Sequence, residues 1–526
     1  MLLQLANYRP ISILPVVGKC IEYFVNVQLT KYMEENHLLT DQQYGFRKNN
    51  STTYLMLDLF DEIFNSKSKS CKPAIIFLDV RKAFDTVNHN ILLKKLEHYG
   101  VQGVVLQWFN SYLSGRHQCT KVNGKVSKFT ELNSGVPQGS ILGPILFSIY
   151  INDITNACNL SKPYLFADDG ALFFEDVDRK HYINIKIELL TIVKWLNVNK
   201  LSLHGDKTKF MVFYNISDKV KAKGSKVGVK IKCKIKGKVK GKSKRKAKGN
   251  NINNTSTTAI KGKNKGKNKG KNKGKNKGKN TGTAIEEQLD KISIVTKEGS
   301  LTIKECKTQK YLGLMVDHKL MFTEHIDYII KKVGKRIGAM YRSKNLLPIK
   351  YRKMFANALM LPQFDYLDII YNRAGKSKLK ELDILYKKVA KIALGVSTRE
   401  SSITVYKDME WLPLHLRRQL HLSAYMFRII NNSSPSNFMN KFKFISGGTR
   451  DGNSCNLYTQ KSRTHKEFYY LGAKCWNILP HDLRILPDVK MFSSAYKNRL
   501  LASITTDPQY AVDNSFDYFY KYKDTS

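Results

Sequence analysis

The chain lacks the signatures of several protein classes. Its eight cysteines include no Cys-x-x-Cys pair and no companion histidines at zinc spacing, which argues against a disulfide framework and a zinc knuckle. The longest apolar run, about residues 141–151, is too short to span a bilayer, and no basic segment followed by a clean apolar one opens the chain. We therefore expect an intracellular protein, nuclear or cytoplasmic, that is neither secreted nor membrane-bound.

Acidic residues are also scarce. The 526 residues include 43 Asp and Glu against 89 Lys and Arg, which gives a net charge of +46. A field of this sign and size favours polyanionic partners. Because residues 219–279 hold only 25 of the basic residues, and no acidic one, the rest of the chain is basic as well. The composition predicts a nucleic-acid partner, and the length allows two or three domains with linkers.

One segment has the composition of a disordered insertion. Residues 219–283 are mainly Lys, Gly, Asn and Ser, and residues 261–280 repeat Lys-Gly-Lys-Asn five times. Too few apolar groups are present to offset the entropy of ordering. We expect residues 216–290 to hang from a hairpin between strands at 210–214 and 291–295. The tract fits a solvated spacer, a nuclear localisation signal around residues 244–246, or a nonspecific phosphate-binding tail.

Elsewhere, helical and strand-like patterns alternate. The periodicity predicts helices at 90–99, 104–113, 181–196, 325–340, 379–394 and 415–430. Asn123-Gly124 is the strongest short hairpin signal. This mixture predicts an α+β fold with a sheet covered mainly on one side.

Three aspartates are candidate ligands of a metal ion. Asp79 ends the apolar run at 73–80, and Asp168 and Asp169 stand between two apolar, strand-like runs. Carboxylates at strand ends suit Mg²⁺, a hard ion that completes its shell with water and substrate phosphates. The alternative is that Asp168 and Asp169 are only turn residues of a hairpin. A Gly- and Pro-rich turn at residues 134–140 suits close backbone approach to a ligand such as a base pair.

Six blocks in register resemble the reverse transcriptases of non-long-terminal-repeat (LINE-like, Jockey-type) retrotransposons. The blocks are residues 7–12 (NYRPIS), 43–47 (QYGFR), 77–85 (FLDVRKAFD), 134–140 (SGVPQGS), 166–169 (FADD) and 310–313 (KYLG). The similarity covers residues 7–215 and 291–345, with a looser match to about 500. It implies a right-hand polymerase: fingers and palm at 1–215, the insertion at 216–290, palm end and primer grip at 291–320, thumb at 321–345, and a helical C-terminal region at 346–526.

The resemblance also implies site residues and partners. It implies two Mg²⁺ ions, with Mn²⁺ as an alternative, a DNA primer, an RNA template and dNTPs. Asp79 and Asp168 are the expected principal ligands, with Asp169 secondary and Lys207 donating a proton to pyrophosphate. The remaining expected roles are Phe84 as a gate against ribose, Gln138 and Gly139 under the templating pair, Arg9, Lys19 and Arg47 on the triphosphate, and Leu312 and Gly313 in the primer grip. Core packing is the alternative for Phe84, and plain surface charge for the three basic residues.

The chain also departs from this family. Family members usually carry an endonuclease and further finger segments upstream of NYRP, whereas here Met1 precedes Asn7 by six residues. We interpret the chain as an N-terminally truncated reading frame without its own endonuclease function. The primary hypothesis is an RNA-directed DNA polymerase. The alternative is a catalytically inactive, retroelement-derived protein that binds RNA or DNA.

Overall fold

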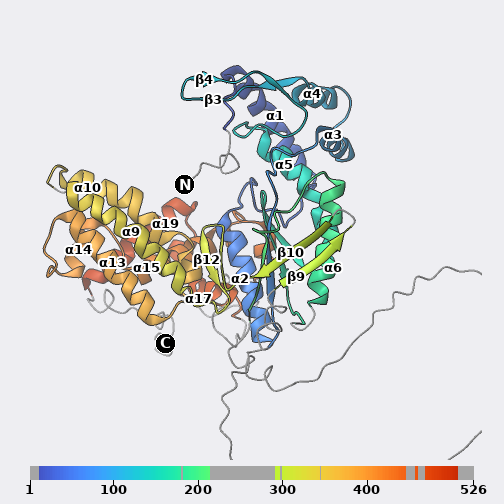
Figure 1. Ribbon diagram of the computed structural model, residues 1–526. Coiled ribbons are helices and arrows are strands. Elements are labelled where there is room, and N and C mark those ends of the chain that lie inside the picture. The colour runs from blue at the N-terminus through green and yellow to red at the C-terminus, as the bar shows by residue number, and fades with distance from the viewer. Residues whose placement is uncertain are drawn as a thin grey trace, which may run out of the picture. The chain divides into compact units, whose positions relative to one another are not determined.

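Short, mostly apolar segments build a six-stranded sheet in the order β6-β7-β1-β8-β10-β9 (Figure 1). The strands are β1 (Ala74–Asp79), β6 (Lys162–Phe166), β7 (Asp169–Phe174), β8 (Lys209–Val212), β9 (Lys291–Thr296) and β10 (Gly299–Glu305). The computed structural model describes residues 11–178, 182–213, 291–296, 299–343, 345–445, 456–459 and 468–506. Arg9 and residues 214–290, which include the whole predicted insertion, lie outside the described residues.

The sheet is antiparallel except at one pair of strands. β1 pairs with β7 on one side and with β8 on the other. β8 pairs in parallel with β10, and β10 pairs with β9 in a hairpin. The expectation that the insertion joins two strands of a hairpin is therefore wrong, because β10 lies between β8 and β9.

Nineteen helical segments accompany the strands in the described residues. The first are α1 (Val16–Glu35), α2 (Thr52–Ser68), α3 (His89–His98), α4 (Gly103–Leu113), α5 (Gly143–Ile151), a 3₁₀ turn (Asn152–Ala157) and α6 (Ile183–Val198). After the sheet come α9 (Thr323–Ser343), α10 (Ile349–Phe355), a π turn (Ala356–Met360), α11 (Leu361–Asp365), α12 (Asp368–Tyr371), α13 (Lys376–Leu394), α14 (Ser402–Met409), α15 (Leu414–Ile430), α16 (Ser436–Met439), α17 (Phe468–Ile478), α18 (His481–Arg484) and α19 (Val489–Thr506).

The six helices predicted from periodicity are all present, within a few residues at each end. Local capping explains several boundaries. The Asn88 side chain accepts from the Ile91 N–H at 3.1 Å and begins α3. Gly395, with φ of 77°, ends α13 in the left-handed conformation that glycine adopts without strain. The α+β class is confirmed.

Both faces of the sheet are buried, so the expectation of one-sided cover is wrong. Ile75 and Phe77 face a core shared with α2. Ile76 and Leu78 face the opposite core, which contains α3, α5 and α6. Figure 1 shows α2 and α6 on opposite sides of the sheet. The near-continuous apolar run of β1 explains the difference, because a strand buried on both faces loses polar alternation.

The core beneath α2 continues into the C-terminal helices. Its buried residues include Tyr54 and Phe60 of α2 together with Phe438 and Phe468 from the C-terminal region. The carboxylate of Asp58, 1 % exposed, accepts from the Tyr44 hydroxyl at 3.0 Å and pairs with Lys441 and Lys162. These contacts fix the C-terminal region to the face of the sheet that α2 covers.

Three two-stranded ribbons complete the described structure. They are β2 (Arg116–Gln118) with β5 (Thr130–Leu132), β3 (Lys121–Val122) with β4 (Lys125–Val126), and β11 (Thr308–Tyr311) with β12 (Leu314–Asp317). Asn123 and Gly124 both have positive φ, at 49° and 80°, which confirms the predicted hairpin.

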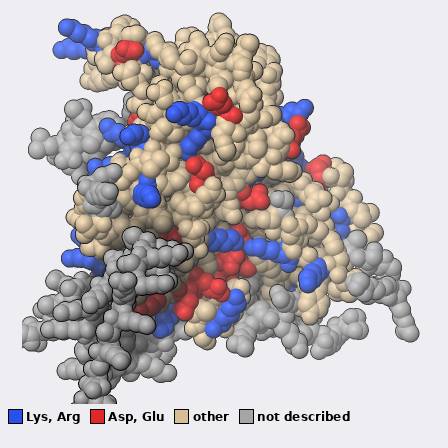
Figure 2. Space-filling view, turned by 90° about the vertical axis from the view of Figure 1, so that its right-hand side faces the viewer, with Lys and Arg blue, Asp and Glu red and all other residues tan. Residues whose placement is uncertain are grey.

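The described structure also bears on membrane insertion and on the distribution of surface charge. No described helix is long and apolar enough to cross a membrane. On the face drawn in Figure 2, lysine and arginine side chains are interspersed with aspartate and glutamate side chains. On that face, the positive charge is therefore not gathered into one patch.

Candidate active site at the end of two strands

The strand register brings the three aspartates to one end of the sheet. Asp79 is the last residue of β1, and it lies directly opposite Asp169, the first residue of β7. Asp168 lies in the turn between β6 and β7, where Phe166 pairs with Asp169. Directly opposed residues of an antiparallel pair have Cβ atoms roughly 4.5–5.5 Å apart. The structure therefore brings together residues that are far apart in the chain.

These carboxylates remain accessible and spread apart. Asp79 and Asp168 are partly buried, and Asp169 is exposed. Among the described residues, neither Asp79 nor Asp168 has an ion pair with a basic side chain. The donor atoms of the three aspartates do not all lie within 4.8 Å of one another, in contrast to a second group described below.

Lys207 lies beside Asp79, in the loop that precedes β8. The His204 N–H donates to the Asp79 carbonyl oxygen at 2.8 Å, and the Asp79 N–H donates to Thr208 Oγ1 at 3.3 Å. Lys207 stands in the turn between these two contacts, and its side chain is exposed. The loop therefore places a basic residue at the same end of the sheet as the aspartates.

The 134–140 segment lies against the loop that follows Asp79. Gly135 donates to the Val87 carbonyl oxygen at 2.7 Å, and Gln138 Nε2 donates to Asp85 Oδ1 at 2.9 Å. A Cβ atom on Gly135 would lie 2.7 Å from the Asp85 carbonyl oxygen, so only glycine permits this approach. Gly139, with φ of 107°, is exposed and lies near Ser12, whose N–H donates to the Gln138 carbonyl oxygen.

Phe84 belongs to the same loop. Its ring stacks on Phe147 of α5, with centroids 4.5 Å apart and an interplanar angle of 22°. The ring is only partly buried. Phe84 therefore contributes to packing and still presents part of its surface, and its predicted role as a gate stays a prediction.

The basic residues predicted to hold a triphosphate differ in their surroundings. Arg47 forms a fork with Glu34, at 2.9 and 2.7 Å, and donates to the Thr40 carbonyl oxygen at 2.7 Å. This geometry fixes the 43–47 segment to α1 and engages most of the guanidinium donors. Lys19 lies partly buried on α1. The triphosphate role of these residues stays a prediction.

The β11–β12 hairpin stands close to the aspartates. Tyr311 is buried, its ring lies 5.3 Å from that of Phe77, and burial followed by the charge of Asp169 raises its pKa well above the ordinary value. Leu312 and Gly313 form the turn with φ of 42° and 85°. The Tyr366 hydroxyl donates to the Leu312 carbonyl oxygen at 2.6 Å and holds that turn in place.

A pair of lysines next to this hairpin was not predicted from the sequence. Lys310 of β11 and Lys332 of α9 lie 5.3 and 5.5 Å from the ring centroid of Tyr328. Burial is the largest single effect and raises the pKa of Tyr328, but the charges and hydrogen bonds of the two lysines together lower it below its ordinary value. Because one lysine is in a strand and the other in a helix, only the folded chain brings them together.

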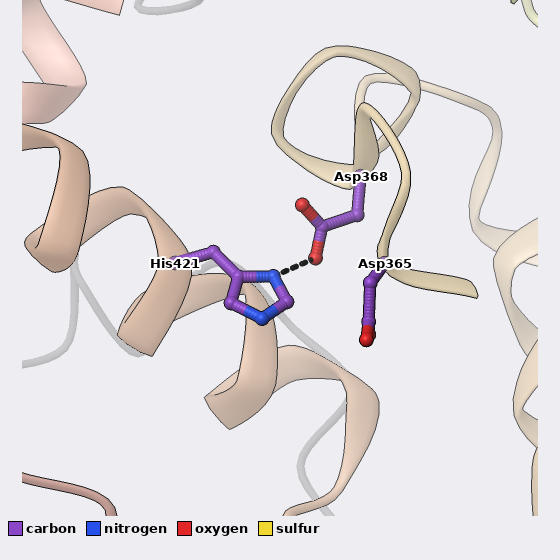
Figure 3. A group of neighbouring side chains, drawn as sticks. All are labelled: Asp365, Asp368 and His421. Carbon is purple, nitrogen blue, oxygen red and sulfur yellow. Dashed lines mark hydrogen bonds and ion pairs between the residues drawn. The ribbon is translucent and has the colours of Figure 1, made fainter. Parts of the chain in front are cut away.

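The second carboxylate group lies in the C-terminal helices (Figure 3). Oxygen atoms of Asp365 and Asp368 and a ring nitrogen of His421 lie within 4.8 Å of one another, a spacing that could hold a metal ion. His421 Nδ1 lies 2.7 Å from Asp368, and Arg417 forms a fork with Asp365. Burial, the largest single effect, lowers the pKa of His421, but Asp368 and Asp365 together raise it above the ordinary value. Each carboxylate has its own basic partner, which favours an ion-pair network.

Comparison with known proteins gives one family and several relatives. Residues 4–316 match the sequence model of the family described as "Reverse transcriptase (RNA-dependent DNA polymerase)". The chain is 22 % identical over 457 residues to the "Probable RNA-directed DNA polymerase from transposon X-element" of Drosophila melanogaster, covering 83 % of this chain and 42 % of that protein.

Two further relatives are shorter matches. The chain is 33 % identical to the "Probable RNA-directed DNA polymerase from transposon BS" of Drosophila melanogaster, covering 38 % of this chain and 23 % of that protein. It is 31 % identical to the "RNA-directed DNA polymerase from mobile element jockey" of Drosophila funebris, covering 29 % and 17 %. The chain thus spans well under half the length of these relatives.

Proposed function

Since the chain belongs to the reverse transcriptase (RNA-dependent DNA polymerase) family, we propose that it is an RNA-directed DNA polymerase of a non-LTR retrotransposon. It adds deoxynucleotides to the 3′-hydroxyl of a DNA primer on an RNA template, inside the cell. The observation that carries this proposal is the register pair Asp79–Asp169, with Asp168 in the adjoining turn. Three carboxylates at one sheet end form an anionic site with hard oxygen donors.

This donor set fits divalent cations of the magnesium type. Carboxylate oxygens at a partly exposed strand end leave room for water and for substrate phosphates in the coordination shell. Asp79 and Asp168 are the proposed principal ligands of two Mg²⁺ ions, or Mn²⁺ ions, with Asp169 beside them. When bound, such ions act as Lewis acids toward the primer hydroxyl and the triphosphate.

The surrounding residues have separate proposed tasks. Gln138 and Gly139 lie beneath the templating base pair, on a turn that Asp85 holds in place. Phe84 excludes a ribose 2′-hydroxyl with the exposed part of its ring. Lys207 donates a proton to the departing pyrophosphate, because its loop adjoins Asp79. Arg9, Lys19 and Arg47 are the proposed triphosphate contacts.

The hairpin and the helices after it bind the nucleic acid. The turn at Leu312 and Gly313 is the proposed primer grip, and α9 is the proposed thumb. Lys310 and Lys332 supply positive charge next to that grip, where they can neutralise phosphates of the primer strand. In this right-hand assignment, the sheet is the palm and α1 belongs to the fingers.

The test is Mg²⁺-dependent dNTP incorporation on a primed RNA template, with wild-type protein beside Asp168→Asn. The substitution keeps the size of the side chain and removes a ligand charge. Asp408→Asn, the same change at an exposed position of α14, is the matched control. We expect extension by the wild type and by the control, and loss on the order of 10³-fold in Asp168→Asn, which corresponds to several kcal/mol. No extension by the wild type despite RNA binding would instead support an inactive binding protein.

A further inference from the structure

A short segment of the chain covers the edge of the sheet next to the aspartates. Residues 42–44 run parallel to β6, one of the two edge strands, through a bridge between Gln43 and Leu165. The backbone N–H of Tyr44 donates to the Leu165 carbonyl oxygen at 2.8 Å, and the Leu165 N–H donates to the Gln42 carbonyl oxygen at 2.9 Å. The segment thus follows the strand that leads into the turn containing Asp168.

The side chain of Gln43 reaches into that turn. It is 1 % exposed, and its Oε1 accepts from the Gly45 N–H at 2.8 Å and from the Ala167 N–H at 3.1 Å. Both donors are backbone amides, which identifies the oxygen rather than the nitrogen of the amide. Ala167 immediately precedes Asp168 and has φ of 56°, a conformation unfavourable for alanine. The hydrogen bond from Ala167 helps to hold the turn in this conformation.

Gly45 permits the close approach of the two segments. A Cβ atom at this position would lie 2.4 Å from the Ala167 nitrogen and 3.0 Å from the Phe166 carbonyl carbon. Both atoms belong to the backbone, so they cannot rotate away as a side chain would. Any larger residue at Gly45 would therefore displace the turn that carries Asp168.

Two side chains, from Tyr44 and from Arg47 just after the segment, anchor it to helices. The Tyr44 hydroxyl donates to the buried Asp58 carboxylate of α2 at 3.0 Å. Arg47 forms its fork with Glu34 of α1. Because α2 and α1 hold the segment, it is a fixed support for the turn between β6 and β7.

We infer that Gln43 and Gly45 form a latch that positions Asp168, and that Gln43 acts as a positioning residue without touching substrate. The inference rests on the proposed function, in which Asp168 holds a metal ion. A displacement of about 1 Å at a reacting group can cost on the order of 10²-fold in rate. Loss of the latch therefore lowers the rate of the chemical step and leaves nucleic-acid binding intact.

Gln43→Met tests the latch, because methionine has a similar length and no strong hydrogen-bond acceptor. Gln42→Met is the matched control: the same change at the neighbouring residue, whose side-chain oxygen accepts from Thr40 Oγ1 instead. We expect Gln43→Met to lower kcat about 10- to 100-fold, to raise the Mg²⁺ concentration needed for half-maximal rate, and to leave KM and the Kd for primed RNA within about twofold. The control is expected to match the wild type. Equal kcat in Gln43→Met and wild type would overturn the inference.

Amide hydrogen exchange separates this inference from the proposed function. The Ala167 N–H is expected to exchange faster in Gln43→Met than in wild type or Gln42→Met, whether or not the protein polymerises DNA. If the wild type incorporates no dNTP, the polymerase proposal fails, and unchanged exchange at Ala167 would then overturn the latch as well. If Gln43→Met does not fold, Gln43→Glu keeps an acceptor and is expected to retain protection at Ala167. Faster exchange in Gln43→Glu would contradict the latch.

Discussion

Two groups of aspartates in this chain are held in opposite ways. Asp365 forms an ion pair with Arg417, and Asp368 lies 2.7 Å from His421 Nδ1. Figure 3 shows the contact between Asp368 and His421. Asp79 and Asp168 have no ion pair with a basic side chain among the described residues, although the register places Asp79 opposite a third aspartate. Compensated charges contribute to stability, whereas uncompensated like charges oppose folding and are typical of functional sites. Proximity of ligand atoms alone would select Asp365, Asp368 and His421 instead of the three aspartates at the sheet end.

Asp79→Asn tests whether the unpaired aspartates serve activity rather than stability. We expect dNTP incorporation to fall on the order of 10³-fold, because a principal metal ligand loses its charge. We expect the free energy of unfolding to stay the same or to rise by up to about 0.5 kcal/mol, since the site has no ion pair to lose and a like charge opposite Asp169 is removed. Primer extension and denaturant unfolding of the same preparation measure both quantities. A loss of several kcal/mol in stability would show that Asp79 has a structural role.

Arg417→Met should give the reverse result. The change keeps the apolar stem, removes the fork, and leaves Asp365 with an uncompensated charge beside Asp368. Breaking a largely buried pair costs about 3 kcal/mol, and we expect a loss of this order in denaturant unfolding. At a temperature low enough for the variant to stay folded, dNTP incorporation by Arg417→Met should stay near the wild-type rate. Lys380→Met, at an exposed position of α13, is the control and should be nearly neutral.

The sequence predicted the elements better than their arrangement. The helices at 90–99 and 415–430 could be predicted because their apolar periodicity is local, and the hairpin at Asn123-Gly124 because two residues with positive φ suffice. Two-sided burial of the sheet was missed, since a run such as that of β1 does not say what covers each face. The place of β10 between β8 and β9 was missed because strand order is a property of long-range pairing.

The candidate site shows the same division. The three aspartates were identified by their positions at strand ends, and the structure adds the pairing of Asp79 with Asp169. Arg47 was expected on a phosphate, but its fork with Glu34 depends on a contact between α1 and the 43–47 segment that no local pattern predicts. The latch of Gln43 on Ala167 was missed for the same reason, although Gln43 and Gly45 stood within a recognised block.

Two histidines, His421 and His325, are expected to change the stability with pH in opposite directions. Asp368 raises the pKa of His421 despite its burial, with Asp365 and Arg417 also nearby, whereas burial lowers the pKa of His325 to about 4. His421 therefore contributes stability below its unfolded pKa of about 6.5, and this contribution is lost as pH rises through the higher folded value. His325 binds its proton only in the unfolded chain between about pH 6.5 and 4, so it lowers stability as pH falls through that window.

The two contributions can be separated by the unfolding free energy of His421→Gln and His325→Phe between pH 5 and 8. Relative to wild type, we expect His421→Gln to lose most at low pH, and the loss should shrink as pH rises. For His325→Phe, the difference should move in favour of the variant as pH falls, because the wild type alone carries the protonation cost. Each slope is bounded by about 1.4 kcal/mol per pH unit, the value for one proton. Slopes of the same sign would show that His421 is not held as a cation by Asp368, and the contrast between paired and unpaired charges would then rest on Asp365 and Arg417 alone.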